Sequence, residues 1–252
     1  MQIDFPSLHH MQQQRSLWQT AFGDTDAFLD SFFRTAYAPD RCRCVLEGDE
    51  IAAILYWIDC SLGKQQLAYI YAVVTHPSHR GKGLCRLLME DTHRLLYSRG
   101  YAGAVLVPQK ESLRKMYEGM GYCDAGSLTV FSCTAAASPV PLRAVGPAEF
   151  ASLRRKMLPE NAVIQEGEGL AFLAEQLQFY AGDNVLLAAY GENGILSVPE
   201  FLGDKTNAPG ILKALNHSRG KFRMPGGTTA FAMFHPLTDS VNPPAYFGFA
   251  FD

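Results

Sequence analysis

The stretch that most constrains the fold of this chain lies between residues 67 and 100. Leu67 to Thr75 is rich in aromatic and β-branched residues and predicts a strand. His76-Pro77 ends the strand, because proline cannot donate a hydrogen bond to a sheet. Leu84 to Arg99 carries apolar residues at helical spacing, and Gly100 closes this predicted helix. The first half of the chain therefore contains a strand, a short loop and an amphipathic helix in direct succession.

The loop of this unit, Arg80-Gly81-Lys82-Gly83-Leu84-Cys85, is suited to hold phosphate groups. Its two glycines let the backbone turn sharply and approach a ligand without a Cβ in the way. The free N–H groups of the first helical turn, together with a helix dipole equivalent to about half a positive charge, favour an anion at the same place. Taken alone, the loop equally fits an ordinary basic turn that caps a helix.

The surroundings of the loop exclude two familiar phosphate sites. No acidic residue follows in a second strand–helix–strand unit, as a dinucleotide site of the Rossmann type requires. The loop also lacks the Gly-Lys-Ser/Thr ending of an NTPase loop, which disfavours magnesium-nucleotide chemistry. A pyrophosphate bound without a metal remains, and the tail of coenzyme A fits that description.

Similar patterns predict the other elements of the first half. Apolar residues at helical spacing indicate one or two helices over Met11–Tyr37, interrupted by Gly23-Asp24-Thr25-Asp26 with an N-cap for the second. Further strands are expected at Arg43–Glu47, Ile51–Asp59, Ala102–Val107 and Leu128–Cys133, and a further helix at Ser112–Gly119.

Composition limits the classes of function. The 252 residues are 48% hydrophobic and 19% charged, with a net charge of −3, so the chain can bury a sizeable core and shows no basic footprint for nucleic acid or an anionic membrane. We find neither a secretory signal at residues 1–10 nor an apolar run of about 20 residues, and we expect a cytoplasmic protein. The six cysteines lack paired C-x-x-C spacing, and we predict no metal and no disulfide.

The proline-containing stretch at residues 134–141 is the best candidate for a linker. We place two domains, at residues 1–136 and 137–252. The second half predicts helices at Pro147–Met157 and Gly169–Tyr180, a hairpin at residues 185–201 and a helix at Ala208–Leu215. Terminal strands at Ala230–Pro236 and Tyr246–Phe251 follow. This order roughly repeats helix, hairpin, helix and strand of the first half.

Two segments resemble motifs of the GNAT superfamily of N-acetyltransferases. Val73 to Leu88 resembles the family signature Arg/Gln-x-x-Gly-x-Gly/Ala, and Leu106 to Tyr122 resembles its later motif Leu/Phe-Tyr-x-x-x-Gly-Phe. Two motifs in the right order and at about the right distance are more specific than either alone. The resemblance covers roughly residues 11–133. It implies an α/β (α+β) fold with a mixed central sheet, flanked by helices and splayed between the strands Leu67–Thr75 and Ala102–Val107.

The resemblance also implies roles for individual residues. The coenzyme would lie in the gap between the two strands, against Val73, Val74 and Thr75, with backbone groups of Val73 and Thr75 paired to the pantetheine arm. The Val73 N–H would polarise the thioester carbonyl. Tyr117 falls on the general acid that protonates the departing thiolate. The residues implied to hold the pyrophosphate through the loop are Arg80, Gly81, Lys82, Gly83, Leu84 and Cys85, and Lys110 stands where the family often has an asparagine that contacts the coenzyme.

The sequence departs from the family pattern where a base is concerned. Tyr69 occupies the strand position at which some members place a glutamate general base. Deprotonation of the amine must then use water, another residue or a substrate that is already neutral. Tyr71, His76 and Glu111 are weak candidates, and each is more often a packing, capping or surface residue. Cys85 at the last small position of the loop is compact enough for binding.

The second half has no loop equivalent to residues 80–85, because Gly203-Asp204-Lys205 is short and contains an acid that would repel phosphate. If the repeat reflects a duplicated domain, the second is a smaller, degenerate GNAT-like α/β domain without a coenzyme site, which covers one wall of the acceptor pocket. Glu200 could meet an acceptor amine there, although a salt bridge is the more ordinary reading.

Two classes of function remain open from the sequence. The first is an acyltransferase that moves an acetyl group from acetyl-CoA to a primary amine of a small molecule or peptide by direct attack. The second is a non-catalytic acyl-CoA-binding sensor or partner-binding module. The loop and Tyr117 favour the first, and the missing strand carboxylate favours the second. A longer-chain CoA thioester is a third option for the donor.

Overall fold

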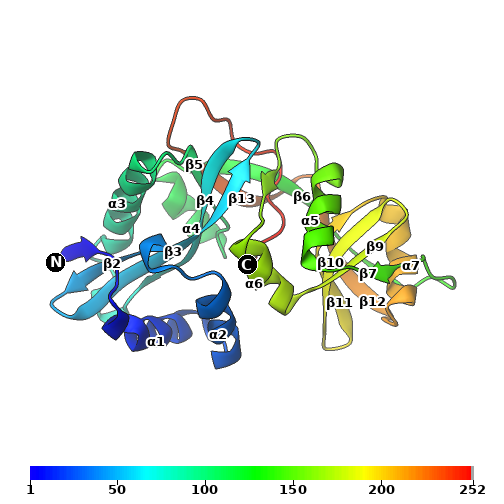
Figure 1. Ribbon diagram of the computed structural model, residues 1–252, viewed down its shortest axis with the longest axis horizontal. Helices are drawn as coiled ribbons and strands as arrows, with labels where there is room; N and C mark the ends of the chain where they lie inside the picture. Colours follow the sequence, from blue (N-terminus) through cyan, green and yellow to red (C-terminus); the bar gives the residue numbers. More distant parts are fainter. Residues whose placement is uncertain (251–252) are drawn as a thin grey trace.

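The strands of this protein form one continuous mixed sheet. The computed structural model describes residues 1–250, and its 13 strands lie in the order β1-β2-β3-β4-β5-β13-β6-β12-β11-β10-β9-β7, with β8 paired to β3 outside this row. Two lobes lie side by side along the sheet (Figure 1), and they meet where β13 pairs with β6. The predicted α/β fold, with a mixed, splayed sheet flanked by helices, is confirmed.

The two halves of the chain supply the following elements. The first half contains β1 (Gln2–Asp4), α1 (Met11–Phe22), α2 (Asp26–Thr35), β2 (Cys42–Glu47), β3 (Glu50–Leu62), β4 (Gln65–Thr75), α3 (Leu84–Ser98), β5 (Gly103–Leu106), α4 (Glu111–Glu118) and β6 (Cys123–Thr134). The second half contains β7 (Arg143–Ala144), α5 (Pro147–Met157), β8 (Val163–Ile164), α6 (Glu168–Gln176), β9 (Gln178–Gly182), β10 (Val185–Glu192), β11 (Ile195–Leu202), α7 (Ala208–Ala214), β12 (Arg219–Pro225) and β13 (Thr229–Pro236).

The strand order is symmetrical about the contact between β13 and β6. Both halves contain one parallel pair, β4 with β5 and β11 with β12, and otherwise run antiparallel. The last strand of each half lies in the row of the other, because β13 pairs with β5 and β6 pairs with β12. This topology agrees with the repeat predicted from the order of elements. The segments before and after residue 136 are therefore joined twice by strand pairing, through β6 with β12 and through β13 with β5.

Apolar side chains on both faces of the sheet explain why helices cover each face of the first half. On one face Trp18 of α1 and Phe32 of α2 pack against Tyr56 of β3, with ring centroids 5.2 and 5.3 Å from the tyrosine ring. On the other face α3 and α4 pack through Leu88 and Tyr117. From Ala53 to Ile58 of β3, buried side chains alternate between the two clusters, as strand geometry requires.

The structure differs from the sequence-based expectations mainly in the second half. The expected helix at residues 169–180 ends at Gln176, and β9 follows at once. β12 was missed because three of its seven residues are charged and only Gly220 and Phe222 are buried, so the alternation is weak. The terminal strand expected at residues 246–251 is wrong over its described part, where Tyr246 forms an isolated bridge to Ala162; residue 251 lies outside the described residues. Within residues 1–250 no helix is long and apolar enough to cross a membrane.

Candidate active site

A gap opens in the sheet between β4 and β5. The two strands pair over three positions only, from Leu67 with Gly103 to Tyr69 with Val105. β4 continues beyond that point to Thr75, paired with β3 on its other edge. Its edge toward β5 is therefore left without a strand partner from Ile70 onward, within the part of the chain that the structure describes. Unpaired backbone groups at such an edge can bind an extended ligand.

A bulge in β4 lies at this gap. Tyr71 pairs with Tyr56 and Val74 with Ile54, so that Ala72 and Val73 stand opposite one residue of β3. Ala72 has a φ of 49°, a backbone conformation that residues other than glycine rarely adopt. A bulge bends its strand and redirects the neighbouring side chains. The bulge lies just beyond the point where β4 and β5 stop pairing, and such backbone strain concentrates at binding and catalytic sites.

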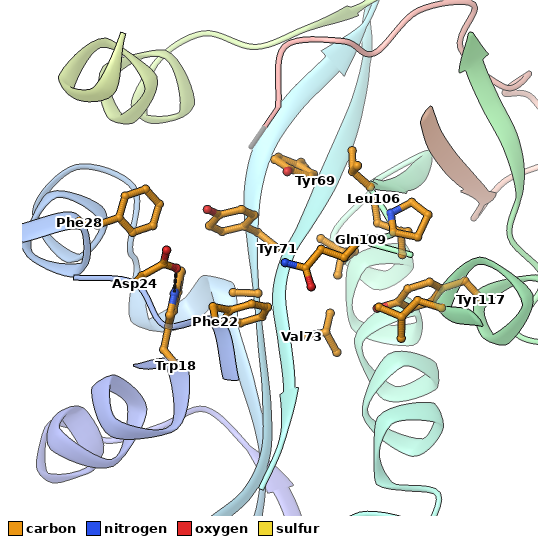
Figure 2. Close-up of a pocket in the computed structure, with 15 residues that line it drawn as sticks. Trp18, Phe22, Asp24, Phe28, Tyr69, Tyr71, Val73, Leu106, Gln109 and Tyr117 are labelled. Atoms are coloured by element: carbon orange, nitrogen blue, oxygen red, sulfur yellow. Dashed lines mark hydrogen bonds between the residues drawn. The ribbon is translucent and has the colours of Figure 1, made fainter. Parts of the chain in front are cut away.

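The gap contains a cavity of about 360 Å³, within the range of small-ligand sites. Its walls come from α1, the α1–α2 loop, α2, β4, the end of β5, the β5–α4 segment and α4, as Figure 2 shows. The lining residues are Trp18, Phe22, Asp24, Phe28, Tyr69, Ile70, Tyr71, Ala72, Val73, Leu106, Val107, Pro108, Gln109, Leu113 and Tyr117.

Tyr117 lies on the α4 side of this cavity, across from Val73 and Tyr71 of β4 (Figure 2). Its ring is 6% exposed and packs edge-on against Tyr122, with 5.7 Å between centroids. Burial first, and then the neighbouring Cys85 thiol, raise the pKa of the Tyr117 phenol well above its usual value. The hydroxyl is therefore protonated at neutral pH and can act as a proton donor, as a general acid must.

The loop before α3 presents unbonded amides to the solvent. Gly81 and Gly83 have φ angles of 77° and 76°, and a Cβ at either position would meet nothing within 4 Å. Leu87 is the first residue whose amide bonds back, to the Gly83 carbonyl at 3.1 Å. Within residues 1–250 the amides of residues 81–85 donate no hydrogen bond. Open space, free donors and the positive end of a helix of 15 residues together fit a pyrophosphate.

Two basic side chains flank the loop. The Arg80 Nε donates to the Thr75 carbonyl at 3.3 Å, and Arg80 is otherwise exposed. The Lys82 Nζ lies 3.2 Å from Nδ1 of His79, a buried histidine that also contacts Glu47 at 3.2 Å. Both cations are thus tied to the loop by one neighbour and remain accessible to an anion.

The remaining predicted binding residues fall into two groups. Val73, Leu84 and Cys85 pack in the same apolar cluster as Tyr117, so the strand bulge, the start of α3 and α4 come together there. Val74 points to the opposite face of the sheet, and Thr75 pairs with Ala53.

Lys110 lies apart from this group. It is the exposed N-cap residue of α4 and does not line the cavity, whereas its neighbour Gln109 does. Figure 2 shows the Gln109 amide reaching toward the middle of the cavity. The amide side chain that faces the gap therefore stands one residue before the position that the sequence motif indicated.

The three candidates for a base differ in position from one another and from Tyr69, which stands where the glutamate is missing. Tyr69 and Tyr71 line the cavity. Burial raises the pKa of Tyr71, so its phenol is neutral and a poor proton acceptor. His76 caps the turn after β4 through the Ser78 amide, and Glu111 is exposed on α4 near Arg114. Neither His76 nor Glu111 lines the cavity.

Asp24 is a further cavity residue that sequence reasoning missed. Its segment was interpreted as a helix cap, and Thr25 does cap α2 through the Phe28 amide. The preceding Asp24 instead turns into the cavity, where its Oδ2 accepts a hydrogen bond of 2.8 Å from the Trp18 indole. No local pattern marks this role, because the cavity walls come from segments more than 80 residues apart in sequence.

Two clusters in the described part of the chain bring together side chains of the metal-ligating type: His9 with His10 and Asp49, and Glu50 with His76 and His79. In both clusters the imidazoles already have protein partners. The His10 Nδ1 accepts from the Ser7 amide, and the His76 Nδ1 accepts from the Ser78 amide. Neither cluster touches the cavity.

In the second half, the strand position of Glu200 and the loop before α7, which would correspond to the candidate site, are occupied by contacts within the protein. Glu200 of β11 is fully buried and forms a bidentate pair with Arg154 of α5, at 2.6 and 2.9 Å, and also accepts from the Tyr246 hydroxyl at 3.1 Å. Glu200 is thus a salt-bridge residue. The loop before α7 is capped by Asp204, whose carboxylate accepts from Thr206, and α7 itself has only 7 residues. These features leave no second anion-binding loop at this position.

The first half of the sequence matches a known protein family. Residues 3–124 match the family described as acetyltransferase (GNAT) domain. None of the curated proteins matches the sequence.

Solved structures resemble the whole chain. A GCN5-related N-acetyltransferase from Kribbella flavida is 18% identical, with 94% of this chain and 72% of that one covered at a TM-score of 0.71. One from Anabaena variabilis is 17% identical, covering 94% and 73%, also at 0.71. A tandem GNAT protein from the clavulanic acid biosynthesis pathway is 11% identical, covering 95% of this chain and all of that one at 0.58. At these identities the likeness concerns the fold.

Proposed function

We propose that this chain moves an acetyl group from acetyl-CoA to a primary amine. Residues 3–124 belong to the GNAT acetyltransferase family, and the chain is therefore an acyltransferase. The observation that carries the proposal is the gap between β4 and β5. The bulged edge of β4 and the protonated Tyr117 phenol border this gap, and the free amides before α3 begin a helix that packs in the same apolar cluster as Val73 and Tyr117. An extended thioester with a pyrophosphate tail needs these three features together. Residues 137–252 form the second domain in this proposal, without a coenzyme site of their own.

We assign the binding of the coenzyme to backbone groups. The amides of Gly81 to Cys85 would hold the pyrophosphate, with Arg80 and Lys82 beside it, because the loop is open and its donors are unbonded. The free edge of β4 from Val73 to Thr75 would pair with the pantetheine arm. An amide at the bulge, such as that of Val73, would stabilise the developing oxyanion.

The chemistry is a direct transfer. The amine nitrogen attacks the thioester carbonyl carbon, a C–N bond forms, and the C–S bond breaks. Tyr117 gives its proton to the departing thiolate and is reprotonated from water. The acceptor, which starts as an ammonium ion, loses one proton to water before the attack and a second one after the C–N bond has formed. The net release is one proton. Burial raises the pKa of the Cys85 thiol to about 11, so this cysteine is a poor nucleophile at neutral pH and an acetyl-cysteine intermediate is disfavoured.

The test is release of free thiol from acetyl-CoA. We expect release that depends on an added primary amine and saturates with acetyl-CoA. A longer-chain CoA thioester in parallel would report the acyl preference. If the chain binds acetyl-CoA but no amine of a chemically varied panel causes thiol release, it is a binding module instead. We expect the protein in the cytoplasm, where acetyl-CoA is available.

A further inference from the structure

Asp24 is the one acidic or basic residue among those that line the cavity. The other 14 lining residues are apolar or neutral, and most of those near Asp24 are aromatic. Within residues 1–250 the Asp24 carboxylate makes a single hydrogen bond, from the Trp18 indole, and no ion pair. A half-buried carboxylate in aromatic surroundings without a cation is energetically unfavourable, so a cationic ligand would gain by pairing with it.

The chain holds this carboxylate in a fixed place. Gly23 ends α1 with a φ of 75°, and Thr25 begins α2 as its N-cap, so Asp24 lies between two capped helices. Its hydrogen-bond donor, Trp18, is 1% exposed and packs edge-on against Tyr71 at 5.6 Å. One oxygen of Asp24 is therefore anchored to the core, and the other has no partner among the described residues.

The aromatic surroundings suit the same ligand. Trp18, Phe22, Phe28 and Tyr71 line the cavity around Asp24 (Figure 2). Aromatic faces attract ammonium groups and also pack against methylene or aryl groups. Tyr71 remains a neutral phenol, because burial and the nearby Asp24 charge both raise its pKa. It therefore does not compete with Asp24 for a cation as a second anion would.

The second half of the chain borders the approach to Asp24. A neighbouring cavity shares Asp24 and Phe28 with the first and is lined on its far side by Glu175 and Gln176 of α6. Phe172 of α6 packs edge-on against Phe28 at 5.3 Å. Glu175 is already paired with Arg34, so Asp24 remains the unpaired carboxylate along this route.

We propose that Asp24 binds the ammonium group of the acceptor, and that the acceptor is a primary amine on a compact apolar body, aryl or alkyl, which the aromatic walls enclose. This inference rests on the proposed function. It adds the acceptor class and the residue that selects it. Asp24 acts as a binding residue that brings the ammonium into the cavity beside Tyr71 of the bulged strand, with Tyr117 on the opposite wall. The amine attacks the thioester at the bulge once it has lost its proton and left this ion pair.

Calorimetric binding to the full chain, without coenzyme and at pH 7, tests the inference. The probes are 2-phenylethylamine and 1-pentylamine, each compared with the alcohol of the same carbon skeleton. We expect the unmodified chain to bind each amine about tenfold or more tightly than its alcohol, as for a hydrogen bond to a charged group. Equal affinities, or no amine binding at millimolar concentration, would overturn the proposal without any variant.

Two variants sharpen the test. Asp24→Asn keeps an oxygen for the Trp18 indole and removes the charge, so the preference for amine over alcohol should disappear. Asp26→Asn is the matched control, because Asp26 is exposed, pairs with Arg15 and lies outside the cavity. It should retain the preference. A preference that persists in a folded Asp24→Asn protein contradicts the proposal.

Thiol release separates this inference from the proposed function. If the amines bind with the expected preference but cause no thiol release from acetyl-CoA, the proposed amine site at Asp24 is retained and the proposed acetyl transfer is rejected. If the unmodified chain acetylates both amines and Asp24→Asn leaves their KM unchanged, acetyl transfer stands and the role of Asp24 does not. If both hold, Asp24→Asn should raise the KM for the amine about tenfold and leave the KM for acetyl-CoA unchanged.

Discussion

At the scale of single residues, Tyr117 combines a phenol with surroundings that keep it protonated. Burial raises the pKa of this phenol, and no other described side chain forms a hydrogen bond with its hydroxyl. A buried tyrosine normally finds a partner for its hydroxyl. The Tyr117 hydroxyl lies at a cavity wall, so it is open to a hydrogen bond from water or from a ligand atom.

Replacement of Tyr117 by phenylalanine removes the proton donor and keeps the ring. We expect kcat for acetyl transfer to fall by ~10²–10⁴-fold with little change in the KM for acetyl-CoA. Steady-state thiol release measures both. Tyr122→Phe is the control, since Tyr122 bonds His93 at 2.9 Å and does not line the cavity. An unchanged kcat in Tyr117→Phe would remove the general-acid role.

His93 predicts a pH dependence of stability. Burial, with a further contribution from the charge of the stacked His235, lowers the pKa of His93 to about 3. The unfolded chain then takes up a proton near pH 6.5 that the folded chain does not, so the free energy of unfolding falls as the pH drops from 6.5 toward 3. The slope from this residue is at most about 1.4 kcal/mol per pH unit.

Urea unfolding at pH 7, 6 and 5 checks this prediction. The unmodified chain should lose stability toward pH 5, and His93→Gln should show a shallower dependence. The rings that face His93 are Tyr122 and His235, the latter stacked at 4.2 Å, so His235→Gln is measured alongside. Identical slopes in all three proteins would assign the acid sensitivity to other groups.

At the scale of elements, the loop before α3 is built by backbone conformation. Gly83 is the N-cap residue of α3, and its φ of 76° is left-handed. A side chain there would meet no atom within 4 Å, so any effect of a substitution comes from the backbone. A residue with a Cβ pays roughly 1–2 kcal/mol in this conformation and favours a different path for the loop.

Gly83→Ala should therefore weaken acetyl-CoA binding several-fold, because the free amides no longer converge. Gly100→Ala is the matched control at the other end of the same helix, with a φ of 84° and equally open surroundings. Both variants should lose similar stability, measured by thermal unfolding, while only Gly83→Ala changes coenzyme affinity. Equal coenzyme affinities in the two variants would argue against this loop as the binding site.

At the scale of the whole molecule, the two halves depend on each other for strands. β13 lies between β5 and β6, with Phe234 opposite both Val105 and Cys123. A fragment of residues 1–136 would lack this strand and expose the edges of β5 and β6. Exposed apolar edges of this kind lead to aggregation.

We expect residues 1–136 expressed alone to be insoluble or to lack a cooperative unfolding transition. Co-expression with residues 137–252 should restore a soluble complex, since the second fragment brings β13. Size-exclusion chromatography and thermal unfolding measure the result. A stable, monomeric fragment of residues 1–136 would show that the first half folds without β13, as two independent domains would.

The sequence by itself determined the first half well. The strand–loop–helix unit, the two glycines and Tyr117 follow local rules, since hydrophobic spacing and turn chemistry act over a few residues. The predicted helices and strands of residues 11–134 are all present, with bounds shifted by a few residues at some ends. The predicted roles of the coenzyme-binding residues follow the same local motif and stay predictions.

Only the tertiary structure decided the features that join distant segments. Three features depend on partners that have no local sequence signal. They are the position of β13 between β5 and β6, the ion pair of Glu200 with Arg154, and the turn of Asp24 into the cavity. The sheet edge, the buried charge and the cavity wall are completed by long-range packing. Asp24 has the sequence of a helix cap, and it lines the cavity because α1, β4 and the β5–α4 segment converge around it.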